Sequence, residues 1–251
     1  MTPDPMALTA WKADRLRALT AEDGWLNLCD RVEIPPGPQS VGSGAQNGVV
    51  IATGPKVLGV IDAAAQSFTL PDGTRLDFAA SAGGFAQLRV APFLLELHVV
   101  GAQTALRLRD LRLPRHANLQ YFPYRPEWVI RADWQALPQP QTKSIGQKGG
   151  SETEVQLTHF AAFQHLGQPV TLLATHWKGD KPMFVIRDQT SGTETYAASR
   201  FLIGEEITQG AITLDFNRAF HPPCSFTDFA ICPLPPRENI LPFRIEAGER
   251  F

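Results

Sequence analysis

Polar and charged side chains of kinds that bind anions are concentrated in three segments of the C-terminal half. These segments are DQTSGTETYAASRF at 188–201, LDFNRAFHPPCSF at 214–226, and the stretch from 232 to 251. An arginine beside an aspartate can orient a ligand that offers two acceptor oxygens, such as a carboxylate or a phosphate. We therefore expect a small-molecule site, binding or enzymatic, that recognises an anionic group and is formed by Tyr196, Arg200, Asp215, Asn217, Asn239 and Glu249.

Each of these residues has an expected role in that site. Arg200 anchors the anionic group, Asp215 and Asn217 orient it, and Tyr196, Asn239 and Glu249 line the rim. Side chains an even number of residues apart point to the same face of a strand. On a strand framework Tyr196 therefore shares a face with Arg200, and Asp215 shares one with Asn217. The catalytic residues stay unassigned, and whether the protein is an enzyme is left open.

The same side chains also suit a purely structural role. A packed loop must pair its backbone N–H and C=O groups, and the segment 220–243 is rich in proline and aromatic residues. Removing one partner of a buried ion pair costs about 3–5 kcal/mol, which is reason enough to keep such pairs without a ligand. Under this alternative the protein is a structural or protein-interaction module, and the six residues hold the proline-rich loop in place.

A third hypothesis is a thiol nucleophile at Cys224, with His221 as base and Asp215 as orienting group. Cysteines packed beside prolines are more often inert. The six histidines have no paired metal-binding spacing and the three cysteines contain no CxxC motif, so we expect no metal. The glycines at 42–44 and 146–150 do not fit a phosphate-binding loop, and no cofactor is expected.

Composition and charge exclude several classes of protein. The chain has 251 residues, with 23 Lys and Arg against 25 Asp and Glu. A net charge of −2 argues against a nucleic-acid partner. No apolar run is long enough for a membrane span and no secretory signal is evident, so we expect no membrane association. Sparse cysteines favour free thiols and a cytoplasmic location, although a Cys224–Cys232 bridge stays open. The oligomeric state is not indicated.

The fold class expected is mainly β, with antiparallel sandwich-like or barrel-like units and one N-terminal helix. Leu8, Trp11, Leu16 and Leu19 have helical spacing. Beyond Gly24, short apolar runs alternate with turn residues, and Pro71-Asp72-Gly73-Thr74 is the clearest turn. Strands are expected at 48–52, 57–61, 67–70, 88–100, 106–113, 155–163, 169–177, 182–188, 194–202 and 211–216.

These elements predict an N-terminal helix and sandwich-like unit over 1–137 and a polar connection over 138–154. A C-terminal strand meander with a wrapped proline-rich loop follows over 155–251. We expect the units to fuse into one compact body. Arg107, Arg109, Arg112 and Arg115 predict a basic stripe on a solvated face, with an acidic partner as the alternative.

The motifs D-x-T-S-G-x-x-T-Y at 188–196 and D-F-N-R-A-x-x-P-P-C at 215–224 resemble a bacterial and archaeal family known as domain of unknown function 1684. The resemblance extends over most of the chain, including GWLNL at 24–28. The family has no established activity, so the resemblance implies soluble, stand-alone proteins with a polar cluster in the C-terminal half. His221 is not fixed in the family pattern, which weighs against the thiol hypothesis.

Overall fold

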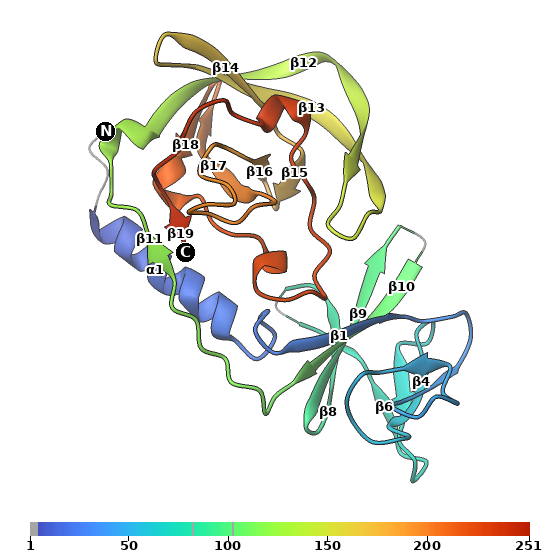
Figure 1. The fold of residues 1–251 in the computed structure, drawn as a ribbon. Helices are drawn as coiled ribbons and strands as arrows, with labels where there is room; N and C mark the ends of the chain where they lie inside the picture. Colours follow the sequence, from blue (N-terminus) through green and yellow to red (C-terminus); the bar gives the residue numbers. More distant parts are fainter. Residues whose placement is uncertain (1–4, 82, 102) are drawn as a thin grey trace. The chain divides into compact units, whose positions relative to one another are not determined.

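The computed structural model describes residues 5–81, 83–101 and 103–251 (Figure 1). The expected mainly β fold with one N-terminal helix is confirmed. Helix α1 (Pro5–Thr20) precedes the four sheets that the described residues form. Each of these sheets is open, so its first and last strands pair on one side only. The described chain forms two compact units. Unit 1 comprises residues up to Leu16 together with Asn118–Phe226 and Ile231–Phe251, and unit 2 comprises Arg17–Ala117 and Thr227–Ala230.

Unit 2 contains two five-stranded sheets that share a hydrophobic core. One has the order β1-β10-β9-β8-β7, with bounds Leu28–Glu33, Gln103–Asp110, Phe93–Val100, Ala86–Val90 and Ala79–Ala80. The other has the order β3-β2-β4-β5-β6, with bounds Val49–Val50, Gln39–Gly42, Gly59–Asp62, Ser67–Thr69 and Arg75–Asp77. Its β2–β3 pair is parallel. Alternation along β10 directs Leu106 and Leu108 into the core with Phe68 and Leu95, and leaves Arg107 and Arg109 on the opposite face.

Two turns in unit 2 show how its strands are delimited. The expected turn at 71–74 is confirmed, because Asp72 Oδ1 accepts the Thr74 amide at 2.9 Å and Gly73 has a φ of 88°. The single strand expected over 88–100 is wrong. Ala91 and Pro92 instead form a turn between β8 and β9, which pair with each other. Proline has no N–H for the ladder, so the apolar run is divided there.

Unit 1 is centred on a seven-stranded antiparallel sheet of order β14-β13-β12-β18-β17-β16-β15. The bounds in that order are Gln168–Leu173, Glu152–His165, Val129–Gly146, Ala211–Asp215, Arg200–Thr208, Lys181–Ile186 and His176–Lys178. Its core includes Trp128, Phe184, Leu202 and Phe216. The α1 residue Trp11 lies 6.3 Å from both Tyr121 and Phe220, measured between ring centroids.

The polar stretch 138–154 lies within unit 1, where it forms the end of the β12–β13 hairpin. Pairing between the two strands shifts register between Ala136 and Gln141. That shift contains Pro138 and Pro140, which cannot donate ladder hydrogen bonds. Residues 118–226, which include this stretch, all belong to unit 1.

The proline-rich segment 220–243 contains two short 3₁₀ turns in unit 1, η3 (Pro223–Ser225) and η4 (Arg237–Asn239), whereas its residues 227–230 belong to unit 2. It is followed by β19 (Glu249–Arg250), which pairs with β11 (Gln120–Tyr121). Among the residues that the structure describes, no helix is both long and apolar enough to cross a membrane.

Two expectations about shared strand faces are wrong. Residues 188–195 form turns, so Tyr196 precedes β17 and is not on the strand that begins at Arg200. Strand β18 ends at Asp215, and Asn217 lies in the 3₁₀ turn η2 (Phe216–Arg218). Local hydrogen bonds of Asp188 and Asp215 with the residues that follow them favour turns over continued strand at both places.

Candidate functional site

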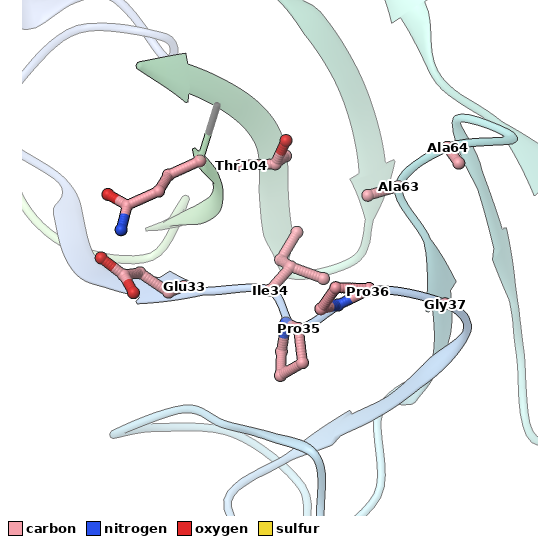
Figure 2. Close-up of a pocket in the computed structure, with 9 residues that line it drawn as sticks. Glu33, Ile34, Pro35, Pro36, Gly37, Ala63, Ala64 and Thr104 are labelled. Carbon is pink, nitrogen blue, oxygen red and sulfur yellow. The ribbon is translucent and has the colours of Figure 1, made fainter. Parts of the chain in front are cut away.

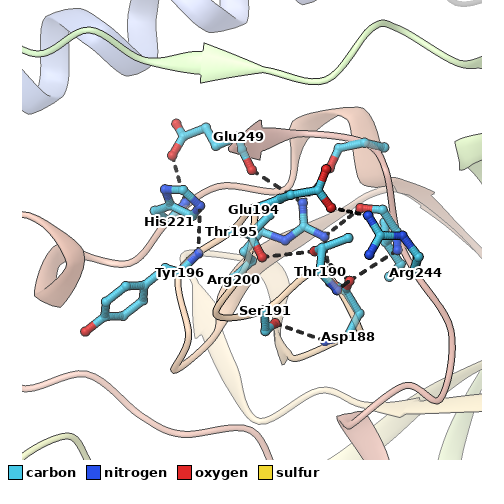
Figure 3. A network of polar contacts seen from close by, with 12 residues as sticks. Asp188, Thr190, Ser191, Glu194, Thr195, Tyr196, Arg200, His221, Arg244 and Glu249 are labelled. Atoms are coloured by element: carbon cyan, nitrogen blue, oxygen red, sulfur yellow. Dashed lines mark hydrogen bonds and ion pairs between the residues drawn. The ribbon is translucent and has the colours of Figure 1, made fainter. Parts of the chain in front are cut away.

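Arg200 and Asp188 form the centre of a buried polar network (Figure 3). Arg200 is the first residue of β17, and Asp188 lies two residues beyond β16, which pairs with β17. Arg200 Nη2 donates to Asp188 Oδ2 at 2.7 Å. Asp188 Oδ1 accepts the amide and hydroxyl of Thr190 at 2.8 and 2.7 Å and the Ile245 amide at 3.2 Å. The carboxylate is therefore surrounded by donors of the protein itself.

The Arg200 guanidinium also binds the backbone of the C-terminal segment. Nη2 donates to the Ile245 carbonyl at 2.9 Å, and Nη1 donates to the carbonyls of Ala247 and Glu249. The Arg200 side chain is 1% exposed. Its Nε has no partner among the described residues. Both terminal nitrogens are thus occupied within the protein.

Glu249 connects α1 with the start of the proline-rich segment. Its Oε1 accepts Arg15 Nε at 2.7 Å, and its Oε2 accepts the His221 amide at 2.7 Å. Arg15 Nη2 in turn donates to the His221 carbonyl at 2.8 Å. Burial and the charge of Glu249 raise the pKa of Tyr121 above its usual range. One carboxylate thereby joins three segments that are remote in sequence.

His221 and Tyr196 extend this network towards Cys224. The Tyr196 amide donates to His221 Nε2 at 3.2 Å, and the Tyr196 hydroxyl donates to the Cys224 carbonyl at 2.9 Å. An amide N–H can only donate, so Nε2 is the unprotonated nitrogen of a neutral imidazole. Burial, with the charges of Arg200 and Arg15, lowers the pKa of His221 to about 3. His221 is therefore neutral at neutral pH.

Asp215 and Asn217 form a separate group around Arg125. Asp215 Oδ1 accepts the backbone and side-chain nitrogens of Asn217, both at 3.0 Å. Asn217 then accepts the Arg125 amide at 3.0 Å and donates to the Arg125 carbonyl at 2.9 Å. Burial raises the pKa of Asp215, although Asn217 and the charge of Arg218 act against the increase.

Asn239 forms a third group. Its Oδ1 accepts the Leu173 amide at 2.8 Å, and its Nδ2 donates to the carbonyls of Leu173 and Val185 at 3.0 and 2.9 Å. These bonds tie η4 to β14 and β16. The amide side chain has no exposed surface left for a ligand.

The six predicted site residues thus fall into three groups. Tyr196, Arg200 and Glu249 belong to one network, whereas the pair Asp215–Asn217 and Asn239 each bind different backbone segments. The thiol triad is not assembled, because His221 Nε2 binds the Tyr196 amide while Asp215 binds Asn217. The sequence did not predict that Arg15 belongs to this network, because no motif or spacing near residue 15 indicates its partners. The D-x-T motif at 188–190 did mark Asp188.

The three cysteines are free thiols, and two of them are in contact. The Cys224 amide donates to Cys232 Sγ at 3.3 Å. Lys148 Nζ donates to the Cys224 carbonyl at 3.1 Å. Among the described residues, no group of three or more His, Cys, Asp or Glu side chains is arranged to hold a metal ion.

Unit 2 carries its own buried ionic network, on the face of its sheet opposite the core. Arg31, Arg107, Glu96 and Gln87 are paired in register across β1, β10, β9 and β8. Glu96 accepts Arg107 at 2.9 Å, Arg109 at 3.1 Å and Gln87 at 2.8 Å. Burial opposes ionisation of Glu96, but the arginines and Gln87 hold its pKa below its usual range.

The solvated basic stripe expected here is therefore wrong for Arg107 and Arg109, which are buried. Arg112 is exposed and pairs with Asp110 at 2.7 Å. Arg115 donates to the Thr20 carbonyl at 3.0 Å.

A cavity of about 460 Å³ lies elsewhere in unit 2 (Figure 2). Figure 2 shows Ile34, Pro35 and Pro36 on the chain that follows Glu33, with Ala63 and Ala64 on a neighbouring segment. None of the six predicted site residues lines this cavity. Its walls are largely apolar, and the Glu33 carboxylate does not favour an anionic ligand there.

Comparison with known proteins gives a family but no activity. The model of a family described as "Protein of unknown function (DUF1684)" matches residues 115–250, which include all six predicted site residues. A solution NMR structure of an uncharacterized protein from Haloarcula marismortui is similar, with 28% identity and a TM-score of 0.44. The similarity covers 53% of this chain and 76% of that one. No curated protein matches the chain.

Proposed function

The chain belongs to the DUF1684 family of proteins of unknown function, and we propose that it is a protein-interaction module. In this proposal, the buried polar network of Asp188, Thr190, Arg200, His221 and Glu249 holds the C-terminal segment rigid. The observation that carries the proposal is that the Arg200 side chain is buried and that its terminal nitrogens are bonded within the protein. Its terminal nitrogens bind Asp188 and the carbonyls of Ile245 and Ala247, and the side chain is 1% exposed.

A ligand-binding site differs from a structural hydrogen-bond network in whether its polar groups are open to solvent or paired within the protein. Binding sites keep a few converging polar groups open to a concave surface. Buried polar groups of a scaffold are paired within the protein. Arg200, Asn239 and Glu249 fit the second description, because each binds backbone or a buried charge of unit 1. A backbone held at so many points offers a preformed surface, which lowers the entropic cost of binding a partner.

The test compares Arg200→Ala with the control Arg244→Ala by thermal unfolding. Arg244 is exposed and pairs with Glu194, as Figure 3 shows, and also with Glu246. Breaking a buried pair costs about 3–5 kcal/mol, which for a chain of this size lowers the Tm by about 6–20 °C. Exposed pairs are worth about 0–1 kcal/mol, so the control should lose no more than about 4 °C.

The anionic-ligand hypothesis predicts the opposite pattern. Arg200→Ala would then keep the wild-type Tm, and phosphate or citrate would raise the Tm of the wild type but not of the variant. That result would overturn the proposal. If Arg200→Ala does not fold, Arg200→Lys provides the comparison. A lysine keeps the charge but cannot bind Asp188 and two carbonyls with a planar fork, so the internal-support proposal still predicts a lower Tm.

A further inference from the structure

We propose that Cys224 and Cys232 form a redox-active dithiol that reacts with low-molecular-weight disulfides, with Cys224 as the attacking thiolate and Cys232 as the resolving thiol. This activity is independent of the interaction-module proposal. It uses side chains whose sulfurs take no part in the bonds of Arg200.

The first support is the position of the two sulfurs. The Cys224 amide donates to Cys232 Sγ at 3.3 Å, so the residues are in contact across the chain reversal at 225–231. Cys224 lies in η3, where Ser225 and Phe226 donate to the carbonyls of Pro222 and Pro223. On the other side, the Cys232 carbonyl accepts the Lys148 amide at 2.9 Å. Backbone contacts of the surrounding residues therefore hold Cys224 and Cys232 next to each other.

The second support is the set of donors around Cys224. Lys148 Nζ and the Tyr196 hydroxyl both donate to the Cys224 carbonyl, at 3.1 and 2.9 Å. An ammonium and a phenol are thus fixed next to this residue. Both bonds are made to the carbonyl and not to the sulfur, but a cation close to a thiol favours its thiolate form, which is the nucleophile in thiol–disulfide exchange.

The two thiols are made unequal by these surroundings. The Cys232 thiol, the Tyr196 hydroxyl and the Lys148 charge together lower the pKa of Cys224 to about 7, although burial acts against them. The pKa of Cys232 is raised by the same contact with Cys224 and by burial. These surroundings therefore favour the thiolate at Cys224 over the thiolate at Cys232.

Cys29 provides the contrast within the same chain. Its Sγ donates to the Leu108 carbonyl at 3.3 Å, and its neighbours are the carboxylates of Asp110 and Asp30. Burial and these negative charges raise the pKa of Cys29 to about 11. We expect this thiol to be unreactive at neutral pH.

The reaction consists of two exchanges. The Cys224 thiolate attacks one sulfur of a disulfide RSSR, whose S–S bond breaks and releases RS⁻, and a mixed disulfide Cys224–S–S–R forms. The RS⁻ takes the proton of Cys232, and the Cys232 thiolate then attacks Cys224 Sγ and releases the second RS⁻, which takes from the solvent the proton that Cys224 lost on ionising. The protein dithiol is oxidised to an intrachain disulfide, and RSSR is reduced by two electrons to two thiols. Both cysteines are 3% exposed, so the substrates are small disulfides.

The experiment treats the native full chain with bis(2-hydroxyethyl) disulfide at pH 7, quenches with N-ethylmaleimide and maps the thiols by mass spectrometry. We expect the wild type to form a Cys224–Cys232 disulfide while Cys29 stays reduced. Cys232→Ser should accumulate the mixed disulfide on Cys224. Cys224→Ser should not react, and Cys29→Ser should behave as the wild type.

Tyr196→Phe tests the positioning role of the hydroxyl. The pH midpoint of Cys224 alkylation in the Cys232→Ser background should shift upwards when the hydroxyl is removed.

Two results would overturn the proposal: a wild type that keeps all three thiols reduced while native, or Cys224→Ser and Cys232→Ser variants that react at equal rates. Neither result depends on the Tm of Arg200→Ala, so this proposal and the interaction-module proposal can fail separately.

Discussion

Arg200 and Asp188 are joined by a 2.7 Å ion pair in which neither side chain is more than 1% exposed. Asp188 receives hydrogen bonds from Thr190 and Ile245 as well, so the pair connects the turn after β16 to the C-terminal segment. A buried charge depends on its partner, because removal of the partner leaves it without a counter-charge and out of reach of water.

Asp188→Ala should reduce the free energy of unfolding by about 3–5 kcal/mol, because it leaves the Arg200 guanidinium buried without a counter-charge. Urea denaturation measures the loss. Asp77→Ala is the control, since Asp77 forms an exposed pair with Arg75, and it should change stability by less than about 1 kcal/mol. The double variant Asp188→Ala/Arg200→Ala should lose less than the two single losses added together. Additive losses would refute the coupling.

Glu96→Gln should destabilise unit 2 by a comparable amount. The substitution leaves Arg107 and Arg109 buried without the single carboxylate that both of them bind, so a loss of about 3–5 kcal/mol is expected. Glu22→Gln is the matched control, because Glu22 pairs with Arg89 at an exposed site. Equal chemical denaturation midpoints for the two variants would contradict the prediction.

Acid should destabilise the protein in part through His221. The pKa of His221 is about 3 in the folded protein and near 6.5 when unfolded, so the unfolded chain binds a proton that the folded protein excludes. The stabilising contribution is complete above pH 6.5 and is lost as the pH falls towards 3. Unfolding free energies of wild type and His221→Gln, measured between pH 7 and pH 4, should show a smaller loss for the variant. If the free energies of unfolding of the two proteins change in parallel with pH, groups other than His221 cause the acid sensitivity.

Asn239→Asp should destabilise the protein more than a surface Asn→Asp change. The new carboxylate would lose the two donations to the carbonyls of Leu173 and Val185 and would place a negative charge beside them. We expect a loss of about 2–4 kcal/mol from the unmade hydrogen bonds and the buried charge. Asn118→Asp is the control, since Asn118 accepts an exposed bond from Gln120. Thermal unfolding measures the Tm of both variants, and equal Tm values would contradict the prediction.

The sequence predicts those parts of the fold that local chemistry determines. The N-terminal helix and the turn at 71–74 follow from spacing and residue type. The division of 88–100 at Pro92 was missed because apolar residues continue on both sides of the turn. Of the long β12–β13 hairpin, the sequence predicted the 155–163 part of β13 but not β12. The outer part of β12 is polar on both faces, so alternation gives no signal there.

For the candidate site, the sequence predicts the segments but not the contacts. The motif segments at 188–201, 214–226 and 232–251 do meet in unit 1. The strand-face argument failed because Asp188 and Asp215 each turn the chain through local hydrogen bonds. Arg15 could not be predicted, since nothing near it in sequence indicates a partner 234 positions away.

That separation determines when unit 1 can be completed during synthesis. Arg15 and Glu249 leave the ribosome 234 residues apart, which corresponds to ~10–50 s at about 5–20 residues per second. All strands of unit 2 lie between residues 28 and 110 and are made within that interval. Translation therefore favours pairing of the unit 2 strands before Glu249 is available to bind Arg15 of helix α1.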